Sequence, residues 1–213
     1  MGSPLLEHHR LLDFGVGWGR ICRFFLRELP LANIYGADVN SELVEICSKT
    51  FKSSNFFTSP VYPPTDLPDG EFNLIVGYSV FSHLSENACR SWMYEFHRLL
   101  APGGIVAITT RGRDFFDFCE SMKYRQATGY LKALSEMFED FDEARRRYDS
   151  GEFVHCNHHG VSGGGVLNAG FYGESFIPES YARHAYSDRF TLEKFLFEAG
   201  ITEHPILFFK KKA

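Results

Sequence analysis

The 213-residue sequence has no apolar run approaching the ~20 residues that a membrane-spanning helix requires. Its N-terminus lacks the basic segment, apolar run and small-residue cleavage site of a secretory signal. Hydrophobic residues make up 44% of the chain and charged residues 23%, a balance typical of globular proteins. These features predict a cytoplasmic protein with no membrane partner.

Cysteine is also scarce. The five cysteines are odd in number and scattered, and no two have C-x-x-C spacing, which indicates reduced thiols rather than a disulfide framework or a zinc knuckle. The segment His155-Cys156-Asn157-His158-His159 contains metal-ligating residue types, but no second cluster with ligand spacing accompanies it. We therefore predict no metal and interpret this segment as a surface loop or a substrate-pocket group that includes His155.

Positive charge is limited as well. The formal net charge of −5 and a pI near 6.0 leave no global basic field for a phosphate backbone. The two basic clusters, residues 145–147 and 210–212, are interpreted as the solvated ends of a helix and of the chain. The charge pattern predicts that nucleic acid is not a partner.

What the chain does contain is an alternation of strand and helix patterns from Arg10 to about Ile108. Such alternation is typical of a parallel sheet covered by helices on both faces. The expected strands are 11–14, 33–38, 56–57, 72–77 and 105–108, the last entered through a turn at 102–104. The expected helices are 21–29, 41–51 with Leu43, Ile46 and Cys47 inward, and 85–100.

The rest of the chain alternates less regularly. Residues 113–148 are predicted to be helical with a break near Gly129 and with Leu131 facing inward. The glycine- and histidine-rich segment 151–173 predicts loops with short strands around Phe153 and Val166, and 178–186 predicts a short helix. Residues 190–211 fit two antiparallel strands or, over 191–200, a capped helix.

The most informative stretch links the first strand to the first helix. It places Asp13 and three alternating glycines, Gly15, Gly17 and Gly19, after an apolar strand. Glycine lets the backbone turn sharply and approach a ligand, and the first turn of the following helix offers unpaired N–H groups. A dinucleotide site has G-x-G-x-x-G, whose third glycine would fall at Arg20. The stretch predicts a cofactor loop of a different spacing.

The pattern Asp13-x-Gly15-x-Gly17-x-Gly19 resembles the first motif of class I S-adenosylmethionine-dependent methyltransferases. The block 72–84, the helix after it and Pro102-Gly103-Gly104 are similar to the small-molecule members called type 11 or type 12, over about residues 10 to 110. The resemblance implies an α/β fold with a doubly wound, Rossmann-like, mostly parallel sheet, closed by an antiparallel C-terminal hairpin. It favours two strands over 190–211.

We expect a single domain over residues 1–213, because no repeat, low-complexity tract or linker divides the chain. Residues 1–112 are the cofactor-binding half, 113–186 a helical and loop insertion or cover, and 187–213 the closing hairpin. Only about nine residues precede the first strand, where class I enzymes usually carry covering helices. The chain is thus expected to be an N-terminal truncation, to use 113–186 as its cover, or to have lost activity.

The resemblance implies S-adenosylmethionine as the cofactor and assigns its site. The methionine part would meet the glycine loop with Asp13 near its amino group, and Asp38 would hold the ribose hydroxyls. The remaining assignments are the adenine border, Val39 and Asn40, and the surroundings of the methyl group, Tyr78 and Ser79. Relatives often carry an acid after the third strand, where this chain has Ser59, so groups near Ser59 are expected to meet the adenine. Asp38 is also a candidate cap of the helix from Ser41.

Methyl transfer depends mainly on proximity and alignment, and a general base is needed only if the acceptor atom carries a proton. His83 is the candidate base because it follows the fourth strand and imidazole titrates near neutral pH. Its alternative is a packed or helix-capping histidine. Tyr172 joins His155 as a candidate substrate residue, and His184 is a further pocket candidate.

The predicted activity is methyl transfer to a small-molecule acceptor that the sequence does not identify. A nicotinamide-dependent oxidoreductase is the alternative enzyme, against which Arg20 and the lack of a second catalytic domain count. A non-catalytic binding module with the same fold is the third possibility. No feature of the sequence predicts the oligomeric state.

Overall fold

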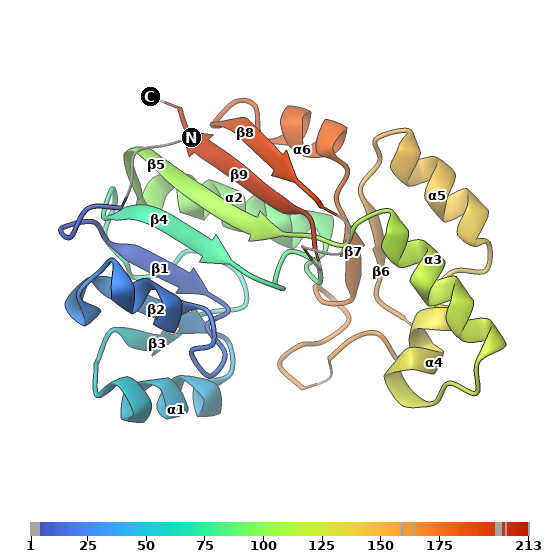
Figure 1. The fold of residues 1–213 in the computed structure, drawn as a ribbon, viewed down its shortest axis with the longest axis horizontal. Coiled ribbons are helices and arrows are strands. Elements are labelled where there is room, and N and C mark those ends of the chain that lie inside the picture. Colours follow the sequence, from blue (N-terminus) through green and yellow to red (C-terminus); the bar gives the residue numbers. More distant parts are fainter. Residues whose placement is uncertain (1–4, 159, 164, 199–201, 203, 213) are drawn as a thin grey trace.

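The computed structural model describes residues 5–158, 160–163, 165–198, 202 and 204–212. Its centre is a seven-stranded sheet in the order β3-β2-β1-β4-β5-β9-β8 (Figure 1). The strands are β1 (Leu11–Phe14), β2 (Ile34–Asp38), β3 (Phe56–Thr58), β4 (Phe72–Gly77), β5 (Leu100–Thr109), β8 (Phe190–Leu196) and β9 (Ile206–Lys211). Strands β1 to β5 pair in parallel, whereas β9 is antiparallel to both β5 and β8. The predicted α/β sheet and closing hairpin are confirmed.

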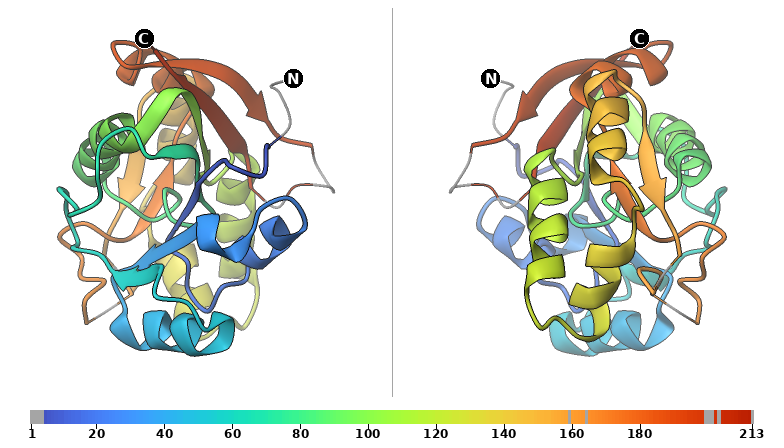
Figure 2. Two further views of the ribbon diagram at one scale, coloured as in Figure 1. Left: turned by 90° about the vertical axis from the view of Figure 1, so that its left-hand side faces the viewer. Right: turned by 90° about the vertical axis from the view of Figure 1, so that its right-hand side faces the viewer.

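Helices lie on both faces of this sheet because the central strands are apolar on both. Leu12 and Phe14 of β1 pack in one cluster with α2 (Glu86–Leu99), and the preceding Leu11 packs in another. That second cluster includes residues of the 3-10 helix η1 (Cys22–Arg27) and of α1 (Ser41–Phe51). Figure 2 shows α2 and η1 on opposite sides of the sheet.

Helix α2 follows its sequence pattern closely. Ser85 caps it by accepting a hydrogen bond from the Ala88 N–H, and the apolar stripe of Ala88, Trp92, Phe96 and Leu99 is buried. The rings of Trp92 and Phe96 pack on Phe14, with centroids 4.4 and 5.1 Å apart. The helix thereby fixes the sheet beneath the loop that follows β1.

A separate group of elements lies beside the carboxyl end of β5 (Figure 1). It consists of α3 (Asp114–Ser121), η3 (Met122–Tyr124), α4 (Gly129–Glu136), α5 (Phe141–Asp149) and a two-stranded antiparallel sheet of β6 (Val154–Cys156) and β7 (Glu174–Phe176). In its core, the ring of Phe116 in α3 stacks on that of Phe176 in β7, with ring centroids 3.9 Å apart. Helix α6 (Glu179–Ala185) then connects this group to β8. In the first half of the chain, a short 3-10 helix, η2 (Leu31–Asn33), precedes β2.

Several expected details are wrong. Ile46 is 48% exposed because α1 turns Val44 and Cys47 inward, and Leu131 is 43% exposed because Ala133 and Leu134 carry the buried face of α4. Val166 is 52% exposed and lies in a turn rather than in a strand. All three side chains are apolar, but each lies on the solvent-exposed side of its helix or loop.

Two element boundaries also differ from expectation. The helix expected over 21–29 is the six-residue η1, of which only Cys22 is buried, while Phe24 and Leu26 are exposed. Strand β5 begins at Leu100, and the residues expected to form a turn at 102–104 bulge within it: Phe72 pairs with Leu100, and Leu74 with Ile105. In the described part of the chain, no helix is long and apolar enough to cross a bilayer.

Candidate functional site

The glycine loop after β1 needs glycine for its backbone conformation. Gly15, Gly17 and Gly19 have φ of +76°, +54° and +87°, which L-residues rarely adopt. A Cβ on Gly15 would lie 2.3 Å from Val80, and one on Gly19 would lie 2.5 Å from the Phe51 ring. A Cβ on Gly17 would meet nothing within 4 Å. The loop is therefore packed at its two ends and open at its middle.

This difference can be tested on the protein without ligand. Gly15→Ala is expected to lower the free energy of unfolding by about 2–4 kcal/mol, from the left-handed φ and the overlap with Val80 together. Gly17→Ala is the matched control, with only the backbone strain to bear, and should cost about 1–2 kcal/mol. Urea unfolding of both variants measures the difference, and equal losses would contradict this loop geometry.

Asp38, at the end of β2, faces the glycine loop. Its two carboxylate oxygens accept hydrogen bonds of 2.9 Å from the backbone N–H groups of Gly17 and Asn40. The cap of α1 is Asn40 instead, because its side chain accepts from Glu42 and Leu43. Each oxygen of Asp38 retains a second lone pair, so the carboxylate holds the loop and can still accept from a ligand.

A cavity of about 570 Å³ opens beside this carboxylate. Six of the ten residues predicted to bind a cofactor line it: Gly15, Asp38, Val39, Asn40, Ser59 and Ser79. The wall also includes the predicted substrate residue Tyr172. Gly17, Gly19, Tyr78 and Asp13 do not line the cavity. Sequence positions more than 130 residues apart therefore meet at one hollow at the carboxyl ends of β1, β2 and β4.

Asp13 lies beneath the loop rather than on the cavity wall. It is 1% exposed; Oδ2 accepts from the Cys22 N–H at 2.9 Å, and Oδ1 is enclosed without a partner among the described residues. Burial raises the pKa of Asp13 to about 7, although the Cys22 hydrogen bond opposes the shift. This carboxyl ties the glycine loop to η1 and carries a titration near neutral pH.

Apart from Tyr172, another part of the cavity wall was not assigned from the sequence. It comes from the segment 163–172, which contributes Gly163, Gly165, Val166, Leu167, Phe171 and Tyr172. The richness of 151–173 in glycine was the only local signal, and it indicated a loop without indicating where the loop lies. Elsewhere on the wall, the Ser59 Oγ is enclosed and has no hydrogen-bond partner among the described residues. An unsatisfied hydroxyl on a cavity wall is suited to a polar ligand atom.

The loop after β4 carries the remaining predicted residues. Ser79 has φ +59°, and its N–H donates to the Thr109 hydroxyl at 2.7 Å. Tyr78 packs under the Arg20 guanidinium, which lies 5.1 Å from its ring centroid. His83 is 9% exposed and stacks on Tyr172, with ring centroids 4.9 Å apart and planes 6° from parallel. His83 is thus not itself a lining residue, but it contacts Tyr172, which is one.

The histidine cluster at 155–158 does not reach this cavity. His155 Nδ1 lies 2.7 Å from the Ser175 hydroxyl, and Nε2 is enclosed without a partner among the described residues. Burial lowers the pKa of His155 below its usual value. Within the described residues no three His, Cys, Asp or Glu side chains are grouped to hold a metal ion. His159 lies outside the described residues.

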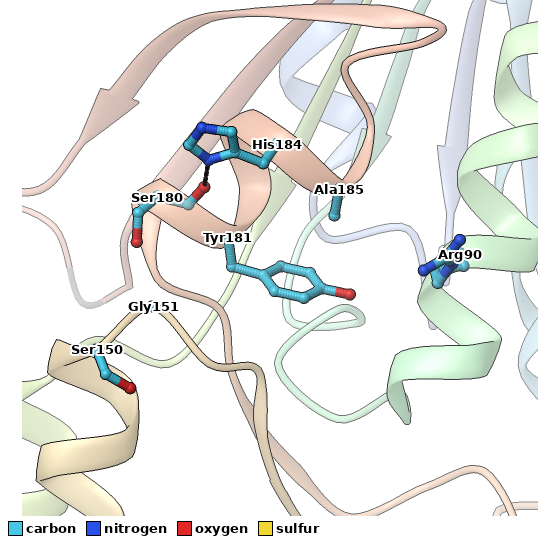
Figure 3. A pocket seen from close by; sticks show the side chains of 7 residues that line it. All are labelled: Arg90, Ser150, Gly151, Ser180, Tyr181, His184 and Ala185. Carbon is cyan, nitrogen blue, oxygen red and sulfur yellow. Dashed lines mark hydrogen bonds between the residues drawn. The ribbon is translucent and has the colours of Figure 1, made fainter.

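A second hollow of about 500 Å³ lies between α2, the end of α5 and α6 (Figure 3). Arg90 and Tyr181 face it, and of the candidate residues from the sequence only His184 lines it. His184 Nδ1 bonds to the Ser180 carbonyl within α6 at 2.7 Å, and Tyr181 donates to Glu86. The His184 ring and the Tyr181 hydroxyl of this hollow are thus engaged with the protein, whereas the Ser59 hydroxyl of the first cavity is not.

Comparison with known proteins matches the part of the chain that carries the glycine loop. Residues 11–104 match a family model described as a methyltransferase domain. They include the loop, Asp38 and the segment 102–104 of β5, in the order expected. This part of the chain is similar to a methyltransferase domain.

Two curated methyltransferases are similar to parts of this chain. A probable fatty acid methyltransferase of Pseudomonas putida is 27% identical over 100 residues, 45% of this chain. A ribosomal RNA small subunit methyltransferase C of Shewanella sediminis is 34% identical over 88 residues, 38% of this chain. The match spans only about a quarter of each relative's length, 25% in both.

Solved structures share the fold over nearly the whole chain. An S-adenosylmethionine-dependent methyltransferase from Methanosarcina mazei is 16% identical, with a TM-score of 0.62 over 97% of this chain and 94% of that one. A structure described as a Zn-dependent alcohol dehydrogenase, from Rhodobacter sphaeroides, is 12% identical, with a TM-score of 0.63 over 98% and 86%. Fold similarity at this level does not separate the two chemistries. The match to the methyltransferase family model and the spacing of the three loop glycines distinguish methyl transfer from oxidoreduction as the better-supported interpretation.

Proposed function

We propose that this chain binds S-adenosylmethionine in the 570 Å³ cavity and transfers its methyl group to a small molecule. The observation that carries the proposal is the convergence of three features on that cavity. These are the glycine backbone at Gly15, the Asp38 carboxylate and the enclosed, unpartnered Ser59 hydroxyl. Together they offer a close backbone approach, an acceptor for a ribose diol and a polar contact for a base.

The residues present fit this cofactor. Asp38 has free lone pairs for the two ribose hydroxyls, and Val39, Leu43 and Val61 supply apolar walls for adenine. The Ser59 hydroxyl replaces the acid that relatives often carry after the third strand, since it can both donate to and accept from the adenine edge. Gly15 leaves room for the methionine part beside Ser79.

When bound, the cofactor supplies a methyl group activated by its sulfonium sulfur. The chain's contribution is alignment of the acceptor and exclusion of water. Val166, Leu167 and Phe171 line the same cavity as the glycine loop and supply apolar atoms to its wall. In this proposal they provide part of the cover that residues 113–186 were expected to supply.

A small molecule is the acceptor that the charge distribution supports. The basic cluster of α5 is neutralised within the chain: Arg145 pairs with Asp117, Glu120 and Asp142. Its neighbours Arg146 and Arg147 pair with carboxylates as well. Cations held in this way are poorly placed to contact a phosphate backbone.

Calorimetry with S-adenosylmethionine, S-adenosylhomocysteine and NAD tests the cofactor part of the proposal. We expect both sulfur compounds to bind with micromolar affinity and NAD to give no heat. Binding of NAD alone would instead support the oxidoreductase, and binding without any turnover would support the non-catalytic module.

The acceptor is tested by incubating the protein with S-adenosylmethionine labelled in its methyl group and with a cell extract divided into two fractions. We expect label to enter the small-molecule fraction. Label confined to the RNA fraction, and abolished by ribonuclease, would overturn the small-molecule acceptor while leaving methyl transfer in place.

A further inference from the structure

Glu174, the first residue of β7, is a fully buried carboxylate that the proposed function does not use. It is 0% exposed and is contacted by three donors from three separate segments. Arg111 Nε donates to Oε2 at 2.7 Å, the Tyr130 hydroxyl of α4 donates to Oε1, and His83 Nδ1 lies 3.1 Å from Oε1. Burial alone would raise the pKa of Glu174, but His83 and Arg111 hold it below its usual value. Glu174 is therefore a buried negative charge.

The contacts of His83 determine which ring nitrogen carries its proton. Nδ1 lies 2.9 Å from the Gly173 carbonyl oxygen and 3.1 Å from the Glu174 carboxylate. Both neighbours are acceptors, so Nδ1 must hold the hydrogen. Nε2 has no hydrogen-bond partner among the described residues and is not among the fully enclosed polar atoms. The neutral ring thus presents a lone pair at Nε2.

The ring is also held beside the cofactor cavity. His83 stacks on Tyr172, and both Tyr172 and the adjacent Leu84 line the cavity. The Gly173 N–H donates to the His83 carbonyl at 2.8 Å, which fastens the loop after β4 to β7. Tautomer, ring plane and backbone are all fixed by the segment 172–174.

We propose that Glu174 is a positioning residue that holds His83 as a general base, and that the methyl acceptor reacts through a hydroxyl or amine. This inference rests on the proposed function. The acceptor lone pair forms the bond to the methyl carbon, and the electron pair of the broken carbon–sulfur bond leaves with the sulfur. The acceptor proton passes to Nε2, and the resulting imidazolium is stabilised through Nδ1–H by the Glu174 carboxylate. A thioether or carbon acceptor without an acidic proton would need none of these groups.

The first test examines the unliganded protein by NMR. Histidine labelled with ¹⁵N gives long-range ¹H–¹⁵N correlations that distinguish the two tautomers, and His83→Gln assigns the His83 signals. We expect neutral His83 to carry its proton on Nδ1. A proton on Nε2 would overturn the proposal, whatever the protein does with the cofactor.

The second test uses two variants that change the same carboxylate in opposite ways. Glu174→Gln removes the charge next to Nδ1, so the hydrogen bond from Nδ1–H weakens and the ¹H resonance of this proton is expected to move upfield. Tyr130→Phe removes a donor from Glu174 and leaves its charge less neutralised, so the same resonance is expected to move downfield. His155 and Arg111 also face this group and are retained in both variants, although Glu174→Gln removes the ion-pair partner of Arg111.

Opposite shifts in the two variants would support electrostatic coupling, whereas shifts in the same direction, or none, would overturn it. Glu174→Gln leaves Arg111 buried without its partner and is the variant at risk of not folding. In that event Tyr130→Phe decides, because Tyr130 is 46% exposed and lies in a surface helix.

The third test identifies the acceptor atom. The extract assay is run with S-adenosylmethionine carrying a ¹³C methyl group, and the ¹³C shift of the product shows whether the methyl is on oxygen, nitrogen, sulfur or carbon. A methyl on oxygen or nitrogen is expected, and one on carbon or sulfur would overturn the acceptor class. Failure of the unliganded protein to bind S-adenosylhomocysteine would count against the proposed function, and the NMR result is independent of it.

Discussion

Asp38→Ala is expected to weaken S-adenosylhomocysteine binding by about 100-fold or more. The carboxylate lies on the cavity wall at the end of β2, where it can accept from both ribose hydroxyls, and each such bond contributes about 1.5–3 kcal/mol. A loss of about 1.4 kcal/mol corresponds to a tenfold change in affinity. Isothermal titration of the wild type and the variant measures the loss.

The variant also removes the acceptor for the Gly17 and Asn40 N–H groups, so part of the loss belongs to the loop. A ligand lacking one hydroxyl separates the two parts. Wild-type protein is expected to bind 2′-deoxy-S-adenosylhomocysteine about tenfold more weakly than the parent compound, whereas Asp38→Ala is expected to bind both equally. An equal penalty for the missing hydroxyl in both proteins would show that Asp38 does not meet the ribose.

Much of the fold was predictable because its determinants are local. Strand β4 and helix α1 were predicted with their observed bounds, since each is a periodic apolar segment closed by turn or cap residues. Strand β5 was not, because its first residues lie before a Pro-Gly-Gly sequence that usually ends a strand. Only pairing with β4 shows that these residues bulge and the strand continues.

In the candidate site as well, residues with a local sequence signal could be predicted and residues that meet through long-range contacts could not. The glycine loop and Asp38 were accessible from the sequence because spacing and position at a strand end carry their signal. Glu174 and its partner Arg111 were not, because a contact across 63 residues has no local pattern. The covering segment 163–172 is a similar case, since its glycines indicate a loop but the sheet decides which cavity the loop meets. Sequence analysis named six residues of this cavity wall on the side of the glycine loop and β4, but only Tyr172 from residues 163–172.

Asp13→Asn is expected to stabilise the unliganded protein at pH 8 and to have little effect near pH 4. Burial raises the pKa of Asp13 from 3.8 to about 7 in the folded chain. The folded state therefore binds a proton more tightly than the unfolded state between these values, and stability falls as the pH rises through this range. This difference in the pKa of Asp13 lowers the free energy of unfolding of the wild type by about 4 kcal/mol at pH 8. The neutral amide in the variant does not titrate and carries no such loss.

Urea unfolding of wild type and variant at pH 4.5, 6 and 8 measures this effect, and the difference between the two proteins removes the contributions of other groups. The amide oxygen that replaces the carboxylate in the variant can still accept from the Cys22 N–H, so the tie between the loop and η1 is retained. A difference that stays constant from pH 4.5 to 8 would contradict the raised pKa of Asp13.

The same carboxyl links cofactor binding to pH. If the amino group of S-adenosylmethionine lies near Asp13, its positive charge favours the ionised carboxylate and lowers the pKa of Asp13 in the complex. Binding at pH 6.5 is then accompanied by release of a proton, and affinity rises with pH up to about 7. Calorimetry in two buffers of different ionisation enthalpy detects that proton. Asp13→Asn should release none, and equal proton release by both proteins would assign the proton to another group and place the cofactor's charge away from Asp13.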